Sequence, residues 1–289
     1  MTPTRTGARL RLLGTAVLFS TGGAGIKWTT LDAWQVSCFR SGVAALAVWL
    51  LVPAARRRWN WRVLVVAAAF ALTLTLFVTA NKLTTSANAI FLQSTAPLYL
   101  LLLGPLVLHE PIRRAGLLYA LAVGGGLLLF FAGSDAVAAT APDPPRGNLL
   151  ALASGVTYAL MLAGLRWQAR GGGESYGVAT VTAGNLIAFL AALPMALPVQ
   201  TFSVRDAAVI FYLGAAQIGL AYWCLTRAIR HVPAFEATTT LQLEPAMNPV
   251  WTWLAYGERP TAWALAGGVV IVSATLVNTW FGRRRPGLK

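Results

Sequence analysis

Two ionisable residues fall inside long apolar stretches of the sequence, where their chemistry would be unusual. Glu244 directly precedes Pro245 within the apolar run 233–256. Arg40 lies inside the earlier run 34–53. Charged side chains within a bilayer are costly and commonly mark sites for substrates, ions or protons. Because proline removes a backbone donor, the helix can loosen beside the Glu244 carboxylate. Glu244 is therefore a candidate substrate-binding or proton-coupling residue.

A structural role is an equal alternative for this acid. Arg40 or backbone donors could hold Glu244 in place and so tie parts of the protein together. Arg40 itself could extend its guanidinium to a membrane interface. We favour pairing with an acid or binding of an anionic group for Arg40, because its planar fork suits carboxylates.

Neutral polar residues accompany the two charges at helical spacing. Asn248 follows Glu244 by one turn, and Gln93 precedes Pro97 by one turn. Residues four apart share a helix face. A single polar residue in a span adds only about 0.6 kcal/mol between helices, but clusters beside a proline at two places favour the lining of a cavity. Further candidates for donors and aromatic faces are Gln217, Tyr158, Tyr222 and Trp223. We expect helix breaks at Pro97 and Pro245.

Enzymatic motifs are weak in this sequence. Gly173-Glu174-Ser175-Tyr176-Gly177 has the residue order of a nucleophile elbow, but that motif needs a strand-to-helix turn and a nearby histidine and acid. The run Gly22-Gly23-Ala24-Gly25 looks like a phosphate loop but falls inside an apolar stretch, where close helix packing or a kink is expected. The histidines His109 and His231 lie at the ends of apolar runs. We expect no catalytic residue, cofactor or metal.

The composition explains why these residues must sit in a membrane. Of 289 residues, 57% are hydrophobic and 11% are charged, whereas a soluble domain has about 25% charged residues. A soluble enzyme, a secreted disulfide scaffold and a disordered protein are therefore excluded. The net charge of +14 comes from small clusters between apolar runs, which is typical of juxtamembrane anchors rather than of a nucleic-acid surface.

Ten apolar runs are long enough to cross a bilayer, which needs about 20 residues per helix. We predict an all-α integral membrane fold with these transmembrane helices: 10–28, 34–53, 62–80, 85–108, 114–133, 147–167, 176–198, 204–226, 233–256 and 261–281. Most of the 23 Lys and Arg residues fall on one side of this topology, the side that holds both termini. The positive-inside rule predicts that both termini are cytoplasmic in a multi-pass protein of the plasma (inner) membrane.

The sequence repeats itself across one long connector, residues 134–146. The same interval separates Pro97 from Pro245 and Glu110 from Glu258. We therefore divide the chain into a first five-helix repeat, the extracytoplasmic connector, a second five-helix repeat and a basic cytoplasmic tail, at 10–133, 134–146, 147–282 and 283–289. Because five is odd, the second repeat enters the membrane inverted. Inverted repeats are typical of transporters with a central cavity near the midplane.

These features resemble the EamA-like permeases of the drug/metabolite transporter superfamily. The resemblance is carried by the run from Ser86 to Pro97 with Glu110, by the run from Glu236 to Pro245 with Glu258, and by Phe39-Arg40-Ser41. It covers residues 10–281. It implies transport of small metabolites across the inner membrane through a central cavity.

We expect a secondary transporter that exports a small organic metabolite, such as an amino acid, by alternating access. Protons are a candidate coupling ion, and Glu244 a candidate coupling group. One alternative is an uncoupled facilitator with the same cavity. Another is a membrane interaction protein that transports nothing, although such a protein would not need Glu244 and Arg40 at the midplane. The expected partners are the substrate and the lipid bilayer, without nucleic acid, and both a monomer and a homodimer remain open.

Overall fold

The computed structural model describes residues 5–56, 59–103, 114–132, 139–170, 176–228, 240–241 and 243–283. Within these ranges the chain forms a bundle of α-helices and contains no β-strand. Five of the described helices are apolar and long enough to cross a membrane, and two shorter ones are apolar as well. The predicted all-α membrane fold is therefore confirmed.

The described helices follow the ten predicted apolar runs in order. The first half contains α1 (Arg5–Ser20), α2 (Gly22–Trp28), α3 (Ala33–Leu51), the 3-10 turn η1 (Pro53–Arg56), α4 (Trp61–Leu83), α5 (Ser86–Gln93), α6 (Ala96–Leu103) and α7 (Arg114–Ala132). The second half contains α8 (Pro144–Arg170), α9 (Tyr176–Ala196), α10 (Val204–Phe211), the π-helical segment η3 (Tyr212–Leu220), α11 (Ala221–Ala228), α13 (Leu243–Tyr256) and α14 (Ala262–Arg283).

Several helices begin at a polar residue whose side chain caps the first turn. Asp32 accepts a hydrogen bond from Gln35 N at 2.8 Å, and the Gln35 side chain accepts one from Asp32 N in return. Ser203 and Asp206 form the same reciprocal box at the start of α10. These caps satisfy backbone donors that have no partner inside the helix, and they explain why α3 and α10 begin at these residues.

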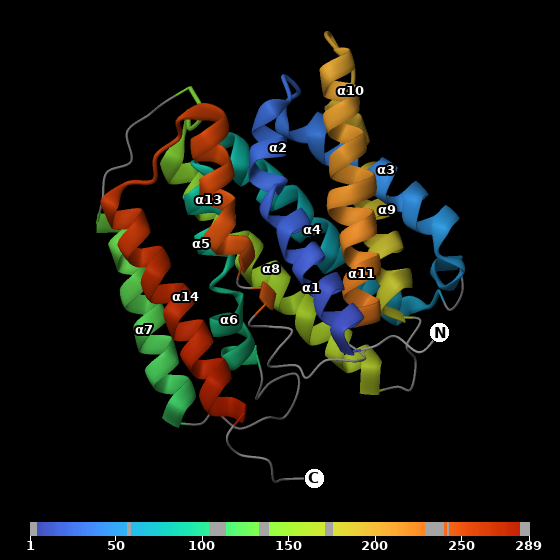
Figure 1. Cartoon of the computed structure of the whole chain (residues 1–289). Helices are drawn as coiled ribbons and strands as arrows, with labels where there is room; N and C mark the ends of the chain where they lie inside the picture. Colours follow the sequence, from blue (N-terminus) through green and yellow to red (C-terminus); the bar gives the residue numbers. More distant parts are fainter. Residues whose placement is uncertain are drawn as a thin grey trace.

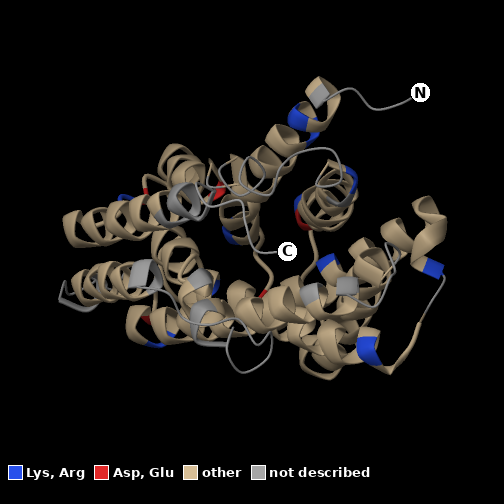
Figure 2. Cartoon of the chain, turned by 90° about the horizontal axis from the view of Figure 1, so that it is seen from below, with Lys and Arg blue, Asp and Glu red and all other residues tan. Residues whose placement is uncertain are grey.

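Elements from the two halves pack against one another throughout the bundle. Helix α4 contacts α8 and α9, α3 contacts α9 and η3, and α1 contacts α11 and α13. Helices α7 and α14 lie side by side along one edge (Figure 1). The start of α1 and the end of α14 lie at the same end of the bundle (Figure 1). In a view along the helices, charged residues are sparse among them (Figure 2).

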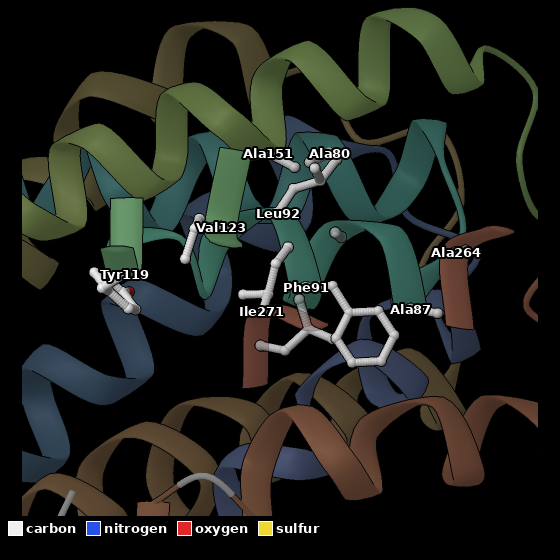
Figure 3. Close-up of a cluster of buried hydrophobic side chains, with 11 residues drawn as sticks. Ala80, Ala87, Phe91, Leu92, Tyr119, Val123, Ala151, Ala264 and Ile271 are labelled. Carbon is white, nitrogen blue, oxygen red and sulfur yellow. The ribbon is translucent and has the colours of Figure 1, made fainter. Parts of the chain in front are cut away.

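A core of buried side chains joins α5 to its neighbours (Figure 3). Phe91 and Leu92 of α5 pack with Ala80 of α4, Val123 of α7 and Ile271 of α14. The contact is close because α14 offers a glycine: a Cβ added at Gly268 would lie 2.6 Å from Cε2 of Phe91. Small residues of this kind let membrane helices approach closely. Here the glycine lets α14 pack directly against α5, which carries one of the candidate polar clusters.

Three spans are interrupted, two of them near residues that the sequence marked. Helices α1 and α2 are separated at Thr21, directly before the predicted glycine kink, and α5 and α6 are separated at Ser94 and Thr95, just before Pro97. In the eighth span, the π-helical segment η3 joins α10 to α11. Helix α13 begins at Leu243, so Pro245 occupies its first turn, where a missing N–H is tolerated. Residue 242 and residues 229–239 lie outside the described residues.

Candidate functional site

A small cavity lies where helices of both halves meet. Its volume is about 100 Å³, and its walls come from α1, α3, α4 and α5 of the first half and from α8, η3, α11 and α13 of the second. The lining residues are Phe19, Arg40, Thr73, Leu74, Phe77, Ile90, Gln93, Ser94, Tyr158, Gln217, Ile218, Tyr222 and Glu244. The structure thus brings together Arg40, Gln93, Tyr158, Gln217 and Glu244, which the sequence singled out separately.

Arg40 is buried in the wall of this cavity, with 2% of its surface exposed. One terminal nitrogen donates to the carbonyl oxygen of Leu74 at 3.3 Å. Its Nε has no hydrogen-bond partner among the described residues. A guanidinium offers five donors, and a buried donor without a partner is costly. Arg40 therefore retains capacity to bind an anionic group in the cavity.

Glu244 enters the same cavity from the first turn of α13. The ion pair found among the described residues joins Lys27 to Glu258, and none joins Glu244 to Arg40. Tyr222 of α11 lies close enough to interact electrostatically with both charges. The cavity therefore presents one cation and one acid at separate points of its wall.

Two amides from different halves complete the polar lining. Gln93 Nε2 donates to Ser154 Oγ at 2.6 Å, and Ser154 Oγ donates to the carbonyl oxygen of Thr73 at 3.2 Å. This chain fixes the Gln93 side chain between α4, α5 and α8. Gln217 Oε1 is buried and has no hydrogen-bond partner among the described residues. Its unused acceptor can receive a hydrogen bond from a polar solute.

Two of the residues singled out from the sequence do not line this cavity. Asn248 lies one turn beyond Glu244 and is fully buried, and neither atom of its amide has a hydrogen-bond partner among the described residues. Trp223 lines a separate hollow of about 300 Å³, and the guanidinium of Arg227 lies 4.2 Å from the centre of its ring. The neighbouring Tyr222 faces the cavity instead.

The cavity is also lined by Phe19, Thr73 and Phe77, which the sequence did not mark as candidates. They carry no charge and stand beside no proline, so a single sequence gives no signal that separates them from other residues of apolar helices. The side chain of Pro97 lies outside the described residues. No group of three potential metal ligands occurs in the described parts of the chain.

A larger hollow of about 730 Å³ is a poorer candidate for a polar solute. It lies between α3, α9 and α10, and its lining includes Phe39, Leu46, Trp49, Phe189 and Phe211. No charged residue lines it. An apolar hollow of this kind offers no means of recognising a charged metabolite, whereas the smaller cavity offers both signs of charge.

Comparisons with known proteins agree with this architecture. The sequence model of the EamA-like transporter family matches residues 8–132 and 145–280. The chain is 30% identical over 271 residues to the uncharacterized protein PA1977 of Pseudomonas aeruginosa. The aligned region covers 87% of this chain and 88% of that protein. It is 29% identical over 258 residues to the pseudopaline exporter CntI of Pseudomonas aeruginosa, and the aligned region covers 86% of each chain.

Two further matches differ in what they cover. The uncharacterized transporter YdfC of Bacillus subtilis is 36% identical over 90 residues, which is 31% of this chain and 29% of YdfC. A solved crystal structure aligns over 97% of this chain and 99% of its own, with a TM-score of 0.65 and 18% identity, and shows the same fold. The family match extends over both halves and nearly the whole length. The chain therefore belongs to the EamA-like transporter family and is a multi-pass membrane protein.

Proposed function

We propose that this protein is a secondary transporter that exports a small zwitterionic metabolite of the amino-acid class. The substrate would occupy the cavity lined by Arg40 and Glu244, and the cavity would open alternately to the two sides of the membrane. Family membership supports a transporter, and the similarity to a protein named as an exporter supports a metabolite as cargo.

The observation that carries the proposal is the separation of Arg40 and Glu244 in one cavity. Each side chain lacks an ion-pair partner within the described residues. Arg40 is buried and Glu244 is partly buried, and burying an unpaired charge is costly. A molecule with a carboxylate and an ammonium group would supply both partners at once. Its carboxylate would accept from the guanidinium of Arg40, and its ammonium group would donate to Glu244. Gln217 and Tyr158 would then contact the uncharged part.

The size of the cavity favours a small cargo. Its volume of about 100 Å³ is below the roughly 300–1,000 Å³ of pockets that hold drug-sized ligands. The aromatic residues Phe19, Phe77 and Tyr222 add apolar surface to the polar groups of the wall. A compact amino acid with an apolar side chain fits both features, and a large drug does not.

Glu244 also offers a means of coupling substrate transport to proton movement. Glu244 is the one carboxylic acid among the lining residues. A proton on Glu244 would cancel the charge that holds the substrate's ammonium group, so the proton and the substrate would compete. In an exporter, release of the substrate on the outside and protonation of Glu244 would then be linked, and inward proton movement would drive export.

Counterflow in proteoliposomes tests the proposal. Vesicles loaded with an unlabelled amino acid are diluted into trace amounts of the labelled compound, and a panel of amino acids is compared with the matching amines and carboxylic acids. We expect exchange for compounds that carry both charges and little for compounds that carry one. Flux that ignores an imposed pH difference would favour a facilitator. An absence of flux for the whole panel would favour a membrane interaction protein.

A further inference from the structure

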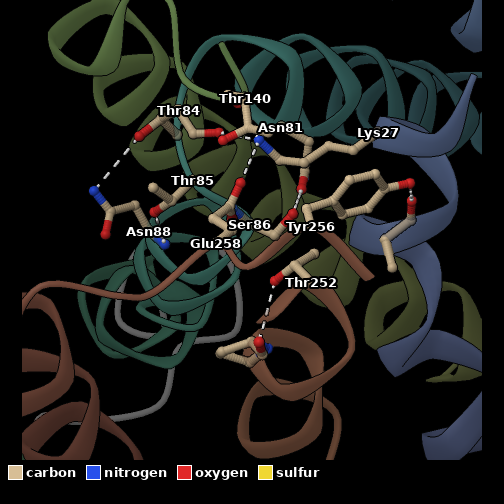
Figure 4. A network of polar contacts seen from close by, with 12 residues as sticks. Lys27, Asn81, Thr84, Thr85, Ser86, Asn88, Thr140, Thr252, Tyr256 and Glu258 are labelled. Carbon is tan, nitrogen blue, oxygen red and sulfur yellow. Dashed lines mark hydrogen bonds and ion pairs between the residues drawn. The ribbon is translucent and has the colours of Figure 1, made fainter. Parts of the chain in front are cut away.

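A buried ion pair lies between the last turn of α2 and the segment after α13 (Figure 4). Helix α2 lies at the end of the bundle opposite the start of α1 and the end of α14 (Figure 1). Lys27 Nζ is 2.9 Å from Glu258 Oε2, and each side chain has 4% of its surface exposed. Lys27 belongs to α2 of the first half, whereas Glu258 follows α13 in the second half. The pair therefore joins the two halves directly.

Further hydrogen bonds hold both members of the ion pair in place. Lys27 Nζ also donates to the carbonyl oxygen of Thr84 at 2.9 Å and to that of Thr140. Glu258 Oε1 accepts from the backbone N–H of Ser86, the first residue of α5, at 2.6 Å. Two ammonium donors are thus taken by carbonyl oxygens, whereas Glu258 Oε2 contacts the ammonium group as an ion pair and accepts no hydrogen bond from a described residue. Removing one partner of a buried pair leaves the other charge uncompensated and is strongly destabilising.

The helices meet closely between this ion pair and the cavity. A Cβ added at Gly23 would lie 2.6 Å from Asn248 Oδ1 of α13 and 2.8 Å from Ser86 Oγ of α5. A Cβ added at Gly22 would lie 2.9 Å from Nε2 of Gln217, which lines the cavity. Lys27 follows Gly23 by one turn and lies on the same face of α2. The path from the cavity toward Lys27 is therefore closed by contact of α2 with α5 and α13.

Helix α2 is short and follows a helix break at its N-terminal end. It spans seven residues and is separated from α1 at Thr21. The Thr21 hydroxyl lies 2.8 Å from that of Tyr212, and at the far end of α2 the Lys27–Glu258 pair ties it to the segment after α13. A second bond supports the same contact, because the hydroxyl of Tyr256 donates to the carbonyl oxygen of Ala24 at 3.3 Å.

We propose that the Lys27–Glu258 pair is the latch of a gate at this end of the transporter. The pair holds α2 against α5 and α13 while the cavity is closed toward this side. It must break, with movement of α2 about Thr21, before the cavity can open here. The inference rests on the proposed transport cycle only in that opening toward this side is one of its steps.

The sequence carries the same residue types at matching points of its second half. Gly25-Ile26-Lys27-Trp28 is echoed by Gly164-Leu165-Arg166-Trp167, and Glu110 corresponds to Glu258 in the internal repeat. The side chain of Arg166 and the residue Glu110 lie outside the described residues. The recurrence of a basic residue and an acid favours a role for Lys27 and Glu258 in the framework that both halves share, rather than in one loop.

A shielded cysteine in the cavity reports whether the gate is open. The native cysteines Cys38 and Cys224 are replaced by alanine, and Ser94→Cys places one thiol in the cavity wall. A membrane-impermeant maleimide is then applied from the Lys27 side. We expect Glu258→Gln and Lys27→Met to speed labelling of the reporter by about tenfold or more, because one partner of a buried pair is lost.

The matched control is Lys82→Met. Lys82 is a neighbouring lysine that donates to the backbone and hydroxyl oxygens of Thr29 at 2.9 and 3.2 Å. Thr29 directly follows α2 and Lys82 lies in the last turn of α4, so these bonds tie α2 to α4 and not to α13 or the segment after it. We expect the reporter to stay as shielded in this variant as in the parent.

Two results would overturn the latch. They are unchanged labelling in correctly folded Glu258→Gln and Lys27→Met, and an equal gain in Lys82→Met. Labelling needs no substrate, so a transport panel without flux would refute the proposed function and leave this measurement intact.

Discussion

Gly23 of α2 lies so close to Asn248 of α13 that a Cβ on the glycine would come within 2.6 Å of the amide oxygen. Asn248 is fully buried, and its side-chain amide forms no hydrogen bond with a described residue. The contact therefore depends on the absence of a side chain at Gly23 rather than on a hydrogen bond. It places the backbone of α2 directly against the helix that carries Glu244.

Gly23→Ala should push α2 away from α5 and α13. Because the added methyl group meets two side chains at less than 3 Å, we expect faster labelling of the Ser94→Cys reporter from the Lys27 side and a lower transport rate. Gly14→Ala is the matched control: Gly14 lies in α1, and nothing lies within 4 Å of a Cβ added there. That variant should behave as the parent or be slightly more stable, since alanine favours helices by about 1 kcal/mol over glycine. Equal effects of the two variants would contradict the steric explanation.

Arg40→Lys tests recognition of a carboxylate in the cavity. Lysine keeps the positive charge but loses the planar fork. The loss of one charge-assisted hydrogen bond costs about 1.5–3 kcal/mol, so we expect the KM for a zwitterionic substrate to rise about 10- to 100-fold while the protein still inserts. The measurement is the concentration dependence of counterflow. An unchanged KM for zwitterions would show that Arg40 has a structural role.

Glu244→Gln tests coupling. Glutamine keeps the shape of the side chain but cannot carry a proton on and off, so we expect transport driven by a pH gradient to be lost while some substrate exchange remains. Flux into liposomes with an imposed pH difference is the readout, and exchange at equal pH is the internal control. A variant that responds to the gradient like the parent would remove Glu244 as the coupling group and favour the facilitator.

Much of the fold was predictable because the bilayer demands long apolar helices. Nine of the ten runs read from hydropathy match described helices within about five residues at each end, whereas the run 233–256 is matched by α13 only from Leu243 onward, because most of its first part lies outside the described residues. The glycine run near Gly22 and the proline at Pro97 both lie next to a helix break. The π-helical segment Tyr212–Leu220 was not predicted. It interrupts a continuous apolar run without a proline, and its geometry follows from packing against other helices rather than from local sequence.

The candidate site was predictable where charge made a residue conspicuous. Arg40 and Glu244 stand out because each is a costly charge in an apolar run, and the structure brings both to one cavity. Trp223 was chosen for its aromatic ring, but adjacent residues of a helix point in different directions, and Tyr222 faces the cavity instead. The Lys27–Glu258 pair was missed because both residues look like ordinary charges at the ends of spans.

Asp206 should matter for stability at the same end of the bundle. Its buried carboxylate accepts from the backbone and hydroxyl of Thr30 at 2.9 and 2.8 Å, and from those of Ser203 at 3.1 and 2.6 Å. It thereby caps α10 and holds the loop after α2. Asp206→Ala leaves these donors without an acceptor, which costs about 1–3 kcal/mol for a buried group. We expect a lower melting temperature in detergent, whereas Asp32→Ala, whose cap lies at an exposed helix start, should lower it less.

The side of the membrane on which the latch lies remains a prediction from charge. Thr140, whose carbonyl oxygen accepts from Lys27, follows Ala139 in the connector, and Ala139 is exposed. We predict that this end is extracytoplasmic, because most of the Lys and Arg residues fall at the other end.

In a chain without Cys38 and Cys224, a cysteine at Ala139 should react with an impermeant maleimide in cells whose outer face is accessible, without prior permeabilisation. A cysteine at Gly7, in the first turns of α1, should react only after the membrane is opened. Labelling in the reverse order would invert the topology, and the latch would then close the cytoplasmic side of the cavity.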